Sequence, residues 1–372
     1  MCRCLVVIMG RVCLWSLACL LQVSQGATVA GTNEITRIGE VRALSGEDIR
    51  QGRAVRLRGV VTARLCRLFI MQDGDSGIFV YPRLARDEGI WTGDDNVFGS
   101  LSPGSEVEIK GVTRQGGFAP VILPYEVKPI GKAPLPAAEP SNPGRFFRGL
   151  DDCRRVEVRG VVQGYWKRPP LGMMLVLDAN PGRFMARLPL EAQNICEGLV
   201  ESEVRLQGVA MAAFNTRGEL LMPSIFVNTL QDLTVVQPPR SAPFDAPKVP
   251  LREVGDFRND LGGKHRLHVE GVVTYAERVP ISFLEDVVWP YSSLLGVAPE
   301  MGCLFFIHDG ETGLKVQTRL PLELAPGDRV EVVGFVDRSR AVSGLSEAVV
   351  RKVGREKPPA ALRVSAEQIV AA

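Results

Sequence analysis

The segment Val55-Arg56-Leu57-Arg58-Gly59-Val60-Val61 decides the fold, because two close copies of it follow along the chain. The second copy covers residues 156–162 (VEVRGVV) and the third covers residues 267–273 (LHVEGVV). In each copy, apolar and polar residues alternate around an interior glycine, which is typical of a β-strand with a bulge or a sharp bend. The recurrence predicts three units built in the same way.

Each copy is followed by the same series of elements. An apolar strand comes next, at 68–73, 174–178 and 304–309, and it leads into an aspartate- and glycine-containing turn. We interpret six turn residues as structural, because aspartate and glycine supply the geometry of a hairpin: Asp73, Gly77, Asp178, Gly182, Asp309 and Gly313. Three more strands complete each unit, the third at 78–81, 183–188 and 314–318, the fourth at 107–111, 204–208 and 330–334, and the fifth at 120–128, 220–228 and 348–353.

Five strands with a helix or loop between the third and the fourth are the order of an OB-type barrel. We therefore predict an all-β chain with minor helix, made of three tandem OB-like five-stranded barrels after an N-terminal signal peptide. The three modules cover residues 35–133, 144–236 and 250–356, and proline-rich linkers at 129–143 and 237–250 separate them. Only the middle module shows a convincing helix between strands three and four, at 190–199.

A short helix at 41–49, capped by Ser45, is predicted to lead into the first module. Residues 362–369 are similar to it, so we interpret 357–372 as a linker and the lead-in of a fourth module that the sequence does not contain. The alternative is that the two segments are merely similar helix starts.

Residues 1–26 differ in composition from the rest of the chain. They combine Arg3 and Arg11 with an apolar run from Val12 to Val23 and small residues at the end, which predicts a secretory signal peptide or an uncleaved N-terminal anchor. We expect an exported protein of the periplasm or cell envelope that meets the membrane only through this segment.

The charge balance argues against a protein whose main function is to bind a polyanion. Lys and Arg number 44 against 42 Asp and Glu, and Arg3 and Arg11 account for the whole excess. A nucleic-acid-binding domain usually carries a clear basic excess. Four cysteines outside the N-terminal segment form no CxxC motif and are expected to be mostly free and buried: Cys66, Cys153, Cys196 and Cys303.

The stretches 41–62 (VRALSGEDIRQGRAVRLRGVVT), 68–81 (LFIMQDGDSGIFVY) and 107–123 (VEIKGVTRQGGFAPVIL) resemble the extracytoplasmic N-terminal regions of certain large bacterial sensor histidine kinases. Those regions carry repeated OB-like modules ahead of a membrane span and a kinase. The resemblance implies a sensory or scaffold role, and a sensor kinase or another envelope protein as partner. It carries over no catalytic residue, because the kinase part is absent from this sequence.

Two loops between the first and second strands of their modules are rich in aromatic residues and proline. OB barrels often bind ligands with this loop, so we predict a binding site for a small molecule, a glycan or a protein there, while packing between barrels is the alternative. The candidate residues are Tyr165, Trp166, Phe283, Trp289 and Tyr291.

A second possible surface lies on the first module, where arginines stand beside aromatic residues. Bases stack on such rings while cations follow the phosphates, so single-stranded nucleic acid is an alternative ligand. The residues concerned are Arg56, Arg58, Arg64, Arg67, Phe69, Phe79 and Tyr81.

No motif of catalysis is present. The sequence has no GxSxG, no phosphate-binding GxxxxGKS and no HExxH, and its three histidines are not clustered as metal ligands. We therefore expect no enzyme, no cofactor and no metal, and predict an exported ligand- or partner-binding protein. Single-stranded nucleic-acid binding is the first alternative, and a secreted carbohydrate-binding or adhesive protein is the second.

Overall fold

The computed structural model describes residues 34–365, apart from 66–67, 169–171, 215–219, 240–241, 255–263, 281–300, 338–343, 362 and 364. The N-terminal segment interpreted as a signal peptide or anchor lies outside these residues, as does most of the segment interpreted as a fourth lead-in. In the part described, no helix combines the length and the apolar character needed to cross a membrane.

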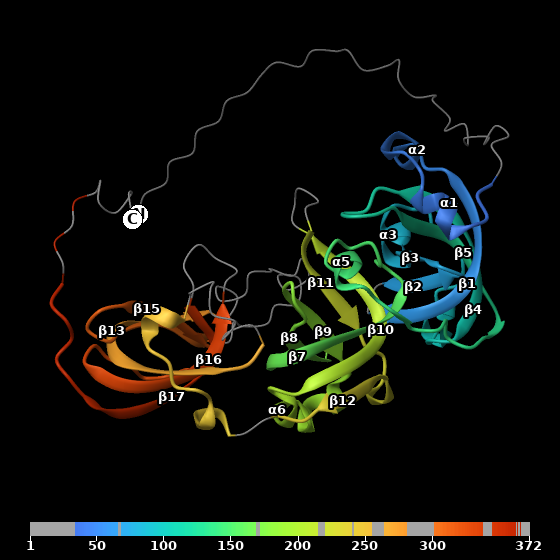
Figure 1. Cartoon of the computed structure of the whole chain (residues 1–372). Coiled ribbons are helices and arrows are strands. Elements are labelled where there is room, and N and C mark those ends of the chain that lie inside the picture. Colours follow the sequence, from blue (N-terminus) through green and yellow to red (C-terminus); the bar gives the residue numbers. More distant parts are fainter. Residues whose placement is uncertain are drawn as a thin grey trace, which may run out of the picture. The chain divides into compact units, whose positions relative to one another are not determined.

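Three OB-type barrels follow one another along the chain (Figure 1). The first is a closed barrel with the strand order β1-β2-β3-β5-β4. Its strands are β1 (Ala54–Leu65), β2 (Leu68–Asp73), β3 (Ser76–Val80), β4 (Ser105–Arg114) and β5 (Val121–Lys132). Every pairing is antiparallel except β3 with β5, which is parallel.

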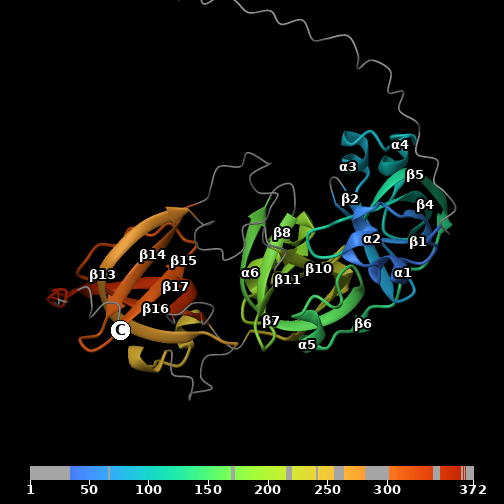
Figure 2. The ribbon, with the colours of Figure 1, turned by 90° about the horizontal axis from the view of Figure 1, so that it is seen from above.

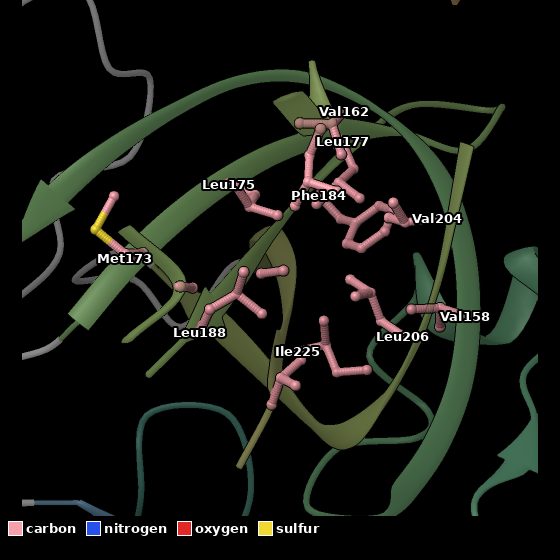
Figure 3. Packing of buried hydrophobic residues seen from close by; sticks show 14 of the residues in the cluster. Val158, Val162, Met173, Leu175, Leu177, Phe184, Leu188, Val204, Leu206 and Ile225 are labelled. Atoms are coloured by element: carbon pink, nitrogen blue, oxygen red, sulfur yellow. The ribbon is translucent and has the colours of Figure 1, made fainter. Parts of the chain in front are cut away.

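The second barrel lies within a seven-stranded sheet of order β12-β10-β11-β9-β8-β7-β6, and the pairing of β10 with β7 closes the ring. Its elements are β6 (Glu139–Pro140), β7 (Arg155–Arg168), β8 (Gly172–Asp178), β9 (Arg183–Leu188), β10 (Glu203–Phe214), β11 (Leu220–Phe226) and β12 (Leu233–Gln237). Inward side chains such as Phe184 and Leu206 converge inside this ring (Figure 3).

The third barrel is again closed, in the order β13-β14-β15-β17-β16. Its strands are β13 (Leu267–Pro280), β14 (Met301–His308), β15 (Gly313–Thr318), β16 (Asp328–Asp337) and β17 (Gly344–Arg355). The prediction of three tandem OB-like barrels is therefore confirmed.

The interior glycine of each first strand makes room for a neighbouring strand. A Cβ atom on Gly59 would lie 2.7 Å from the carbonyl oxygen of Gln72, and one on Gly160 would lie 2.8 Å from the ring of Phe184. The predicted bulge is present a few residues further on, between Val61 and Ala63 in the first barrel. Each first strand pairs with the fourth strand through its first half and with the second strand through its second half, as a bent strand shared by two sheets must.

A short lead-in precedes every barrel and closes one end of its core. It begins with a residue bridged in parallel to the first strand and continues into a short helix. These helices are α1 (Ile38–Arg42), followed by α2 (Gly46–Arg50), in the first barrel, α5 (Pro143–Phe146) in the second and the 3-10 helix η4 (Leu251–Glu253) in the third. Another 3-10 helix, η3 (Pro243–Asp245), comes before the bridged residue Lys248. The side chains of Ile38, Phe146 and Leu251 enter the three cores. Ser45 caps α2 as predicted.

The segment between strands three and four differs from the prediction in the first barrel. It contains α3 (Pro82–Asp87) and α4 (Asn96–Ser100), which contact β5 (Figure 2). In the second barrel the predicted helix is divided into the 3-10 helix η1 (Leu190–Asn194) and α6 (Cys196–Leu199), and the 3-10 helix η2 (Leu230–Asp232) precedes β12. The helices of the first barrel were missed because five or six residues are too few to show a helical period.

Candidate functional site

The outward side of the first three strands of each barrel is the surface on which the candidate site lies. We call it the strand 1–3 face, and OB folds commonly bind ligands on this surface. In each barrel the residue after the bulge of the first strand begins a row of three paired residues across this face. The equivalent rows are Ala63–Ile70–Phe79, Gly164–Val176–Met185 and Tyr275–Phe306–Lys315.

The strand 1–3 face of the first barrel is covered by the second barrel. Ala63 and Ile70 are fully buried in an apolar cluster with residues of β10 and β11. The backbone N–H of Arg155 also donates a 2.9 Å hydrogen bond to the side-chain oxygen of Gln72. The residues of the second barrel in this cluster are Cys153, Val209, Met211 and Phe226.

A partly buried ion pair supports the same contact. Arg42 of α1 donates to the carboxylate of Asp152 at 3.4 Å and to the carbonyl oxygen of Gly77 at 3.1 Å. Asp152 also accepts a hydrogen bond from the backbone N–H of Ala212 at 3.0 Å. Burial raises the pKa of Asp152, although Arg42 opposes that effect.

The strand 1–3 face of the second barrel is covered by the third barrel. The guanidinium of Arg319 lies 4.0 Å from the centre of the Trp166 ring, and only 8% of Trp166 is exposed. Arg183 of β9 donates to the carbonyl oxygen of Val336 at 3.1 Å and to the hydroxyl of Ser346 at 2.9 Å. The second face is therefore occupied, as the first is.

The strand 1–3 face of the third barrel carries two exposed rings. Tyr275 is 49% exposed and Phe306 is 37% exposed. Their ring centroids are 6.3 Å apart and the planes are tilted by 60°. Lys315 lies opposite Phe306 on β15. Within the described part of the chain, this is the strand 1–3 face that no further barrel covers.

A second row on this face carries polar groups. Glu277, Leu304 and Gln317 lie opposite one another on β13, β14 and β15. The hydroxyl of Tyr275 donates a 2.9 Å hydrogen bond to Glu277. That hydrogen bond and the nearby negative charge raise the pKa of Tyr275. Among the residues that the structure describes, the buried amide nitrogen of Gln317 has no hydrogen-bond partner.

One small cavity lies elsewhere, with Glu201, Glu203, Lys264 and His265 among its lining residues. Its volume of about 190 Å³ is below the range of about 300–1,000 Å³ that is usual for small-molecule sites. Among the residues that the structure describes, no three His, Cys, Asp or Glu side chains are grouped as metal ligands.

Two of the five aromatic residues predicted as ligand contacts lie within the described residues. Tyr165 packs against the core of the second barrel, and Trp166 lies beneath Arg319. Phe283, Trp289 and Tyr291 lie outside the described residues.

On the predicted nucleic-acid face of the first barrel, two arginines are exposed but already paired with acidic residues. Arg56 pairs with Glu108 at 3.2 Å, and Arg58 pairs with Glu106 at 2.9 Å, across β1 and β4. Arg64 donates to a backbone carbonyl. The remaining residues are placed as follows: Phe69 in the core, Phe79 against the cluster shared with the second barrel, Tyr81 at the start of α3, and Arg67 outside the described residues.

The turn aspartates act in two ways. Asp309 accepts hydrogen bonds from the backbone N–H groups of Glu311 and Thr312, and Asp178 accepts one from Asn180, so both cap their own turns. Asp73 instead accepts from the backbone N–H of Ile38 at 2.9 Å, at the start of α1. Asp73 therefore holds a lead-in helix rather than its own turn.

Five residues of this face were not predicted as site residues: Tyr275, Glu277, Phe306, Lys315 and Gln317. The signal that could have found them is the residue after each bulge. It is small in the first two copies, Ala63 and Gly164, and a tyrosine in the third.

No protein-family model matches the chain, and no curated protein matches it either. Among solved structures, the chain is similar to the hypothetical protein ygiW from E. coli, with 18% identity and a TM-score of 0.21 over 28% of this chain and 100% of that one. It is also similar to a replication protein A heterotrimer bound to ssDNA, with 12% identity and a TM-score of 0.23 over 84% and 95% of the two chains. A third similar structure is asparaginyl-tRNA synthetase from Pyrococcus horikoshii, with 20% identity and a TM-score of 0.22 over 29% and 24%. None of these likenesses carries an argument about function.

Proposed function

We propose that this chain is a non-enzymatic binding protein whose ligand face is the strand 1–3 face of the third barrel. The observation that carries the proposal is the contrast among the three equivalent rows. Two begin with a small residue and are covered by the next barrel, while the third begins with Tyr275 and presents Tyr275 and Phe306 to solvent. In this proposal the first two barrels serve as a scaffold for the third.

The size of the first residue in the row decides how closely another barrel can approach. A Cβ atom on Gly164 would lie 2.6 Å from the carboxylate of Glu347 in the third barrel. The ring of Tyr275 occupies the equivalent position, so a further barrel cannot pack there as the third packs on the second. This favours a ligand over another barrel at the third face.

A test needs variants that remove the rings without disturbing the fold. Tyr275→Ala and Phe306→Ala truncate exposed side chains, so we expect the barrel to remain folded. Val353→Ala is a matched control, because Val353 is 45% exposed on β17 of the same barrel. Any ligand found by screening the full chain should lose affinity with both ring variants and keep it with the control. A ligand bound equally well by the Tyr275→Ala/Phe306→Ala double variant would refute the proposed face.

Export is a separate part of the proposal. The composition of residues 1–26 and the resemblance to extracytoplasmic sensor regions support a place in the cell envelope. Fusion of these residues to a reporter that is active only after export tests this part. An inactive reporter in the native host would refute it.

Single-stranded nucleic acid is a second candidate ligand, favoured by one observation. Tyr275, Phe306 and Lys315 stand on three neighbouring strands, as the stacking rings and cations of single-strand-binding OB folds do. Fluorescence anisotropy of a labelled oligo(dT) at low salt tests this candidate. Binding that weakens steeply with salt and is lost in Tyr275→Ala would support it.

A further inference from the structure

We infer that the strand 1–3 face of the third barrel binds a neutral saccharide. Sugar rings would lie on Tyr275 and Phe306, and their hydroxyl groups would bond to the polar side chains beside these rings. The inference rests on the proposed function and names the ligand class of that face.

The two rings form a platform suited to the apolar side of a sugar ring. Both are exposed, they lie on the adjacent strands β13 and β14, and their planes are tilted by 60°. The C–H groups on one side of a pyranose can cover one side of an exposed aromatic ring. The other side of that ring need not lose its water. A tilted pair can therefore contact two successive units of an oligosaccharide.

The groups around the platform include both hydrogen-bond donors and acceptors. Glu277 accepts from the Tyr275 hydroxyl at 2.9 Å, and a carboxylate has further lone pairs to accept from hydroxyl groups. Lys315, beside Phe306, supplies donors. Sugar hydroxyl groups donate and accept at once, so a mixed set of this kind matches them.

The charge of the face favours a neutral ligand over a polyanion. Lys315 is balanced by Glu277 on the same face. Most other cations that the structure describes in the third barrel already have acidic partners, so these offer no continuous track for phosphates. These pairs are Arg319–Glu347, Arg329–Glu270, Arg351–Glu331, Lys352–Asp328 and Arg355–Asp328.

The test uses calorimetric titration of the full-length protein with cellohexaose, chitohexaose and maltohexaose, and with oligo(dT) as the anionic probe. We expect at least one hexasaccharide to bind with an affinity that changes little between low and high salt, because few counterions are released. Tyr275→Ala and Phe306→Ala should each weaken it by about ten-fold or more, the equivalent of about 1.4 kcal/mol. Val353→Ala should leave it unchanged, and Glu277→Gln should weaken it by removing the charged acceptor.

The remaining outcomes distinguish a wrong ligand class from a wrong binding face. If only oligo(dT) binds and Tyr275→Ala abolishes that binding, the face is retained and the saccharide is refuted. If a hexasaccharide binds equally well to Tyr275→Ala and Phe306→Ala, the site itself is refuted. If none of the three hexasaccharides binds at millimolar concentration, the saccharide inference fails. Circular dichroism of each variant must match the parent, which excludes unfolding as the cause of a lost affinity.

Discussion

The backbone carbonyl oxygen of Cys153 lies so close to Gly77 that a Cβ atom on Gly77 would approach it to 1.9 Å. Gly77 belongs to β3 of the first barrel, and Cys153 lies just before β7 of the second. The absence of a side chain at Gly77 is therefore what allows the second barrel to cover the first.

Gly77→Ala should destabilise the protein. Backbone atoms cannot move aside as a flexible side chain would, so we expect a loss of about 1–3 kcal/mol, as in other overpacked interiors. Urea unfolding followed by circular dichroism measures it. Gly354→Ala is the control, because no atom lies within 4 Å of a Cβ atom there. Equal stability of the two variants would contradict the close approach of the two backbones.

Trp166→Ala should destabilise the contact between the second and third barrels. The variant would lose packing on Met174 and Met185, and it would remove the ring beneath Arg319. Large buried aromatic residues cost about 3–5 kcal/mol when truncated to alanine. Trp166→Phe keeps a ring for the guanidinium and should lose clearly less. Thermal unfolding by circular dichroism compares the two, and equal losses would show that the ring contributes nothing to the contact.

Much of the fold could be predicted because the decisive signals are local. The copies of Val55–Val61 and the turns after the second strands repeat in sequence, and they fix strand order in an OB barrel. The lead-ins of the second and third barrels gave no such signal, since α5 has four residues and η4 has three. Their role depends on one side chain each, Phe146 and Leu251. These side chains enter cores whose other residues are distant in sequence.

The candidate site could not be predicted for a different reason. Whether Tyr275 points inward or outward depends on the bulge after Val273, and a shift of one residue in a strand reverses its faces. Whether an outward ring is free depends on the next barrel, which covers Trp166 but leaves Tyr275 exposed. The alternation of apolar and polar residues along the sequence shows neither the position of the bulge nor the cover by the next barrel.

Protonation of Asp328 should make the protein less stable in acid. It accepts a 2.9 Å hydrogen bond from the backbone N–H of Ala325 and pairs with Lys352 at 2.9 Å, and these contacts lower its pKa. A carboxyl group whose pKa is lower in the folded state stabilises the fold above its unfolded pKa, and that contribution is lost as the pH falls through the folded pKa. Asp328→Asn should therefore be less stable than the parent at neutral pH, and the difference should shrink below about pH 4. Urea unfolding over this pH range measures it, and a difference that stayed constant with pH would count against the ionised pair.

Arg56 and Glu108 should behave as a coupled pair whose charges can be exchanged. They meet diagonally across β1 and β4, because the register sets Arg56 opposite Lys110 and Glu108 opposite Arg58. The hydrogen bond from Arg56 is the main cause of the lowered pKa of Glu108. Arg56→Glu would replace the ion pair with two like charges at this diagonal contact, so we expect a lower melting temperature. Adding Glu108→Arg should restore part of it, since the new arginine also lies opposite Arg58. Salt should reduce both effects because the pair is exposed. If the exchanged double variant melted no higher than Arg56→Glu alone, the two side chains would not be coupled, and Arg56 would again be a candidate cation for an external anion.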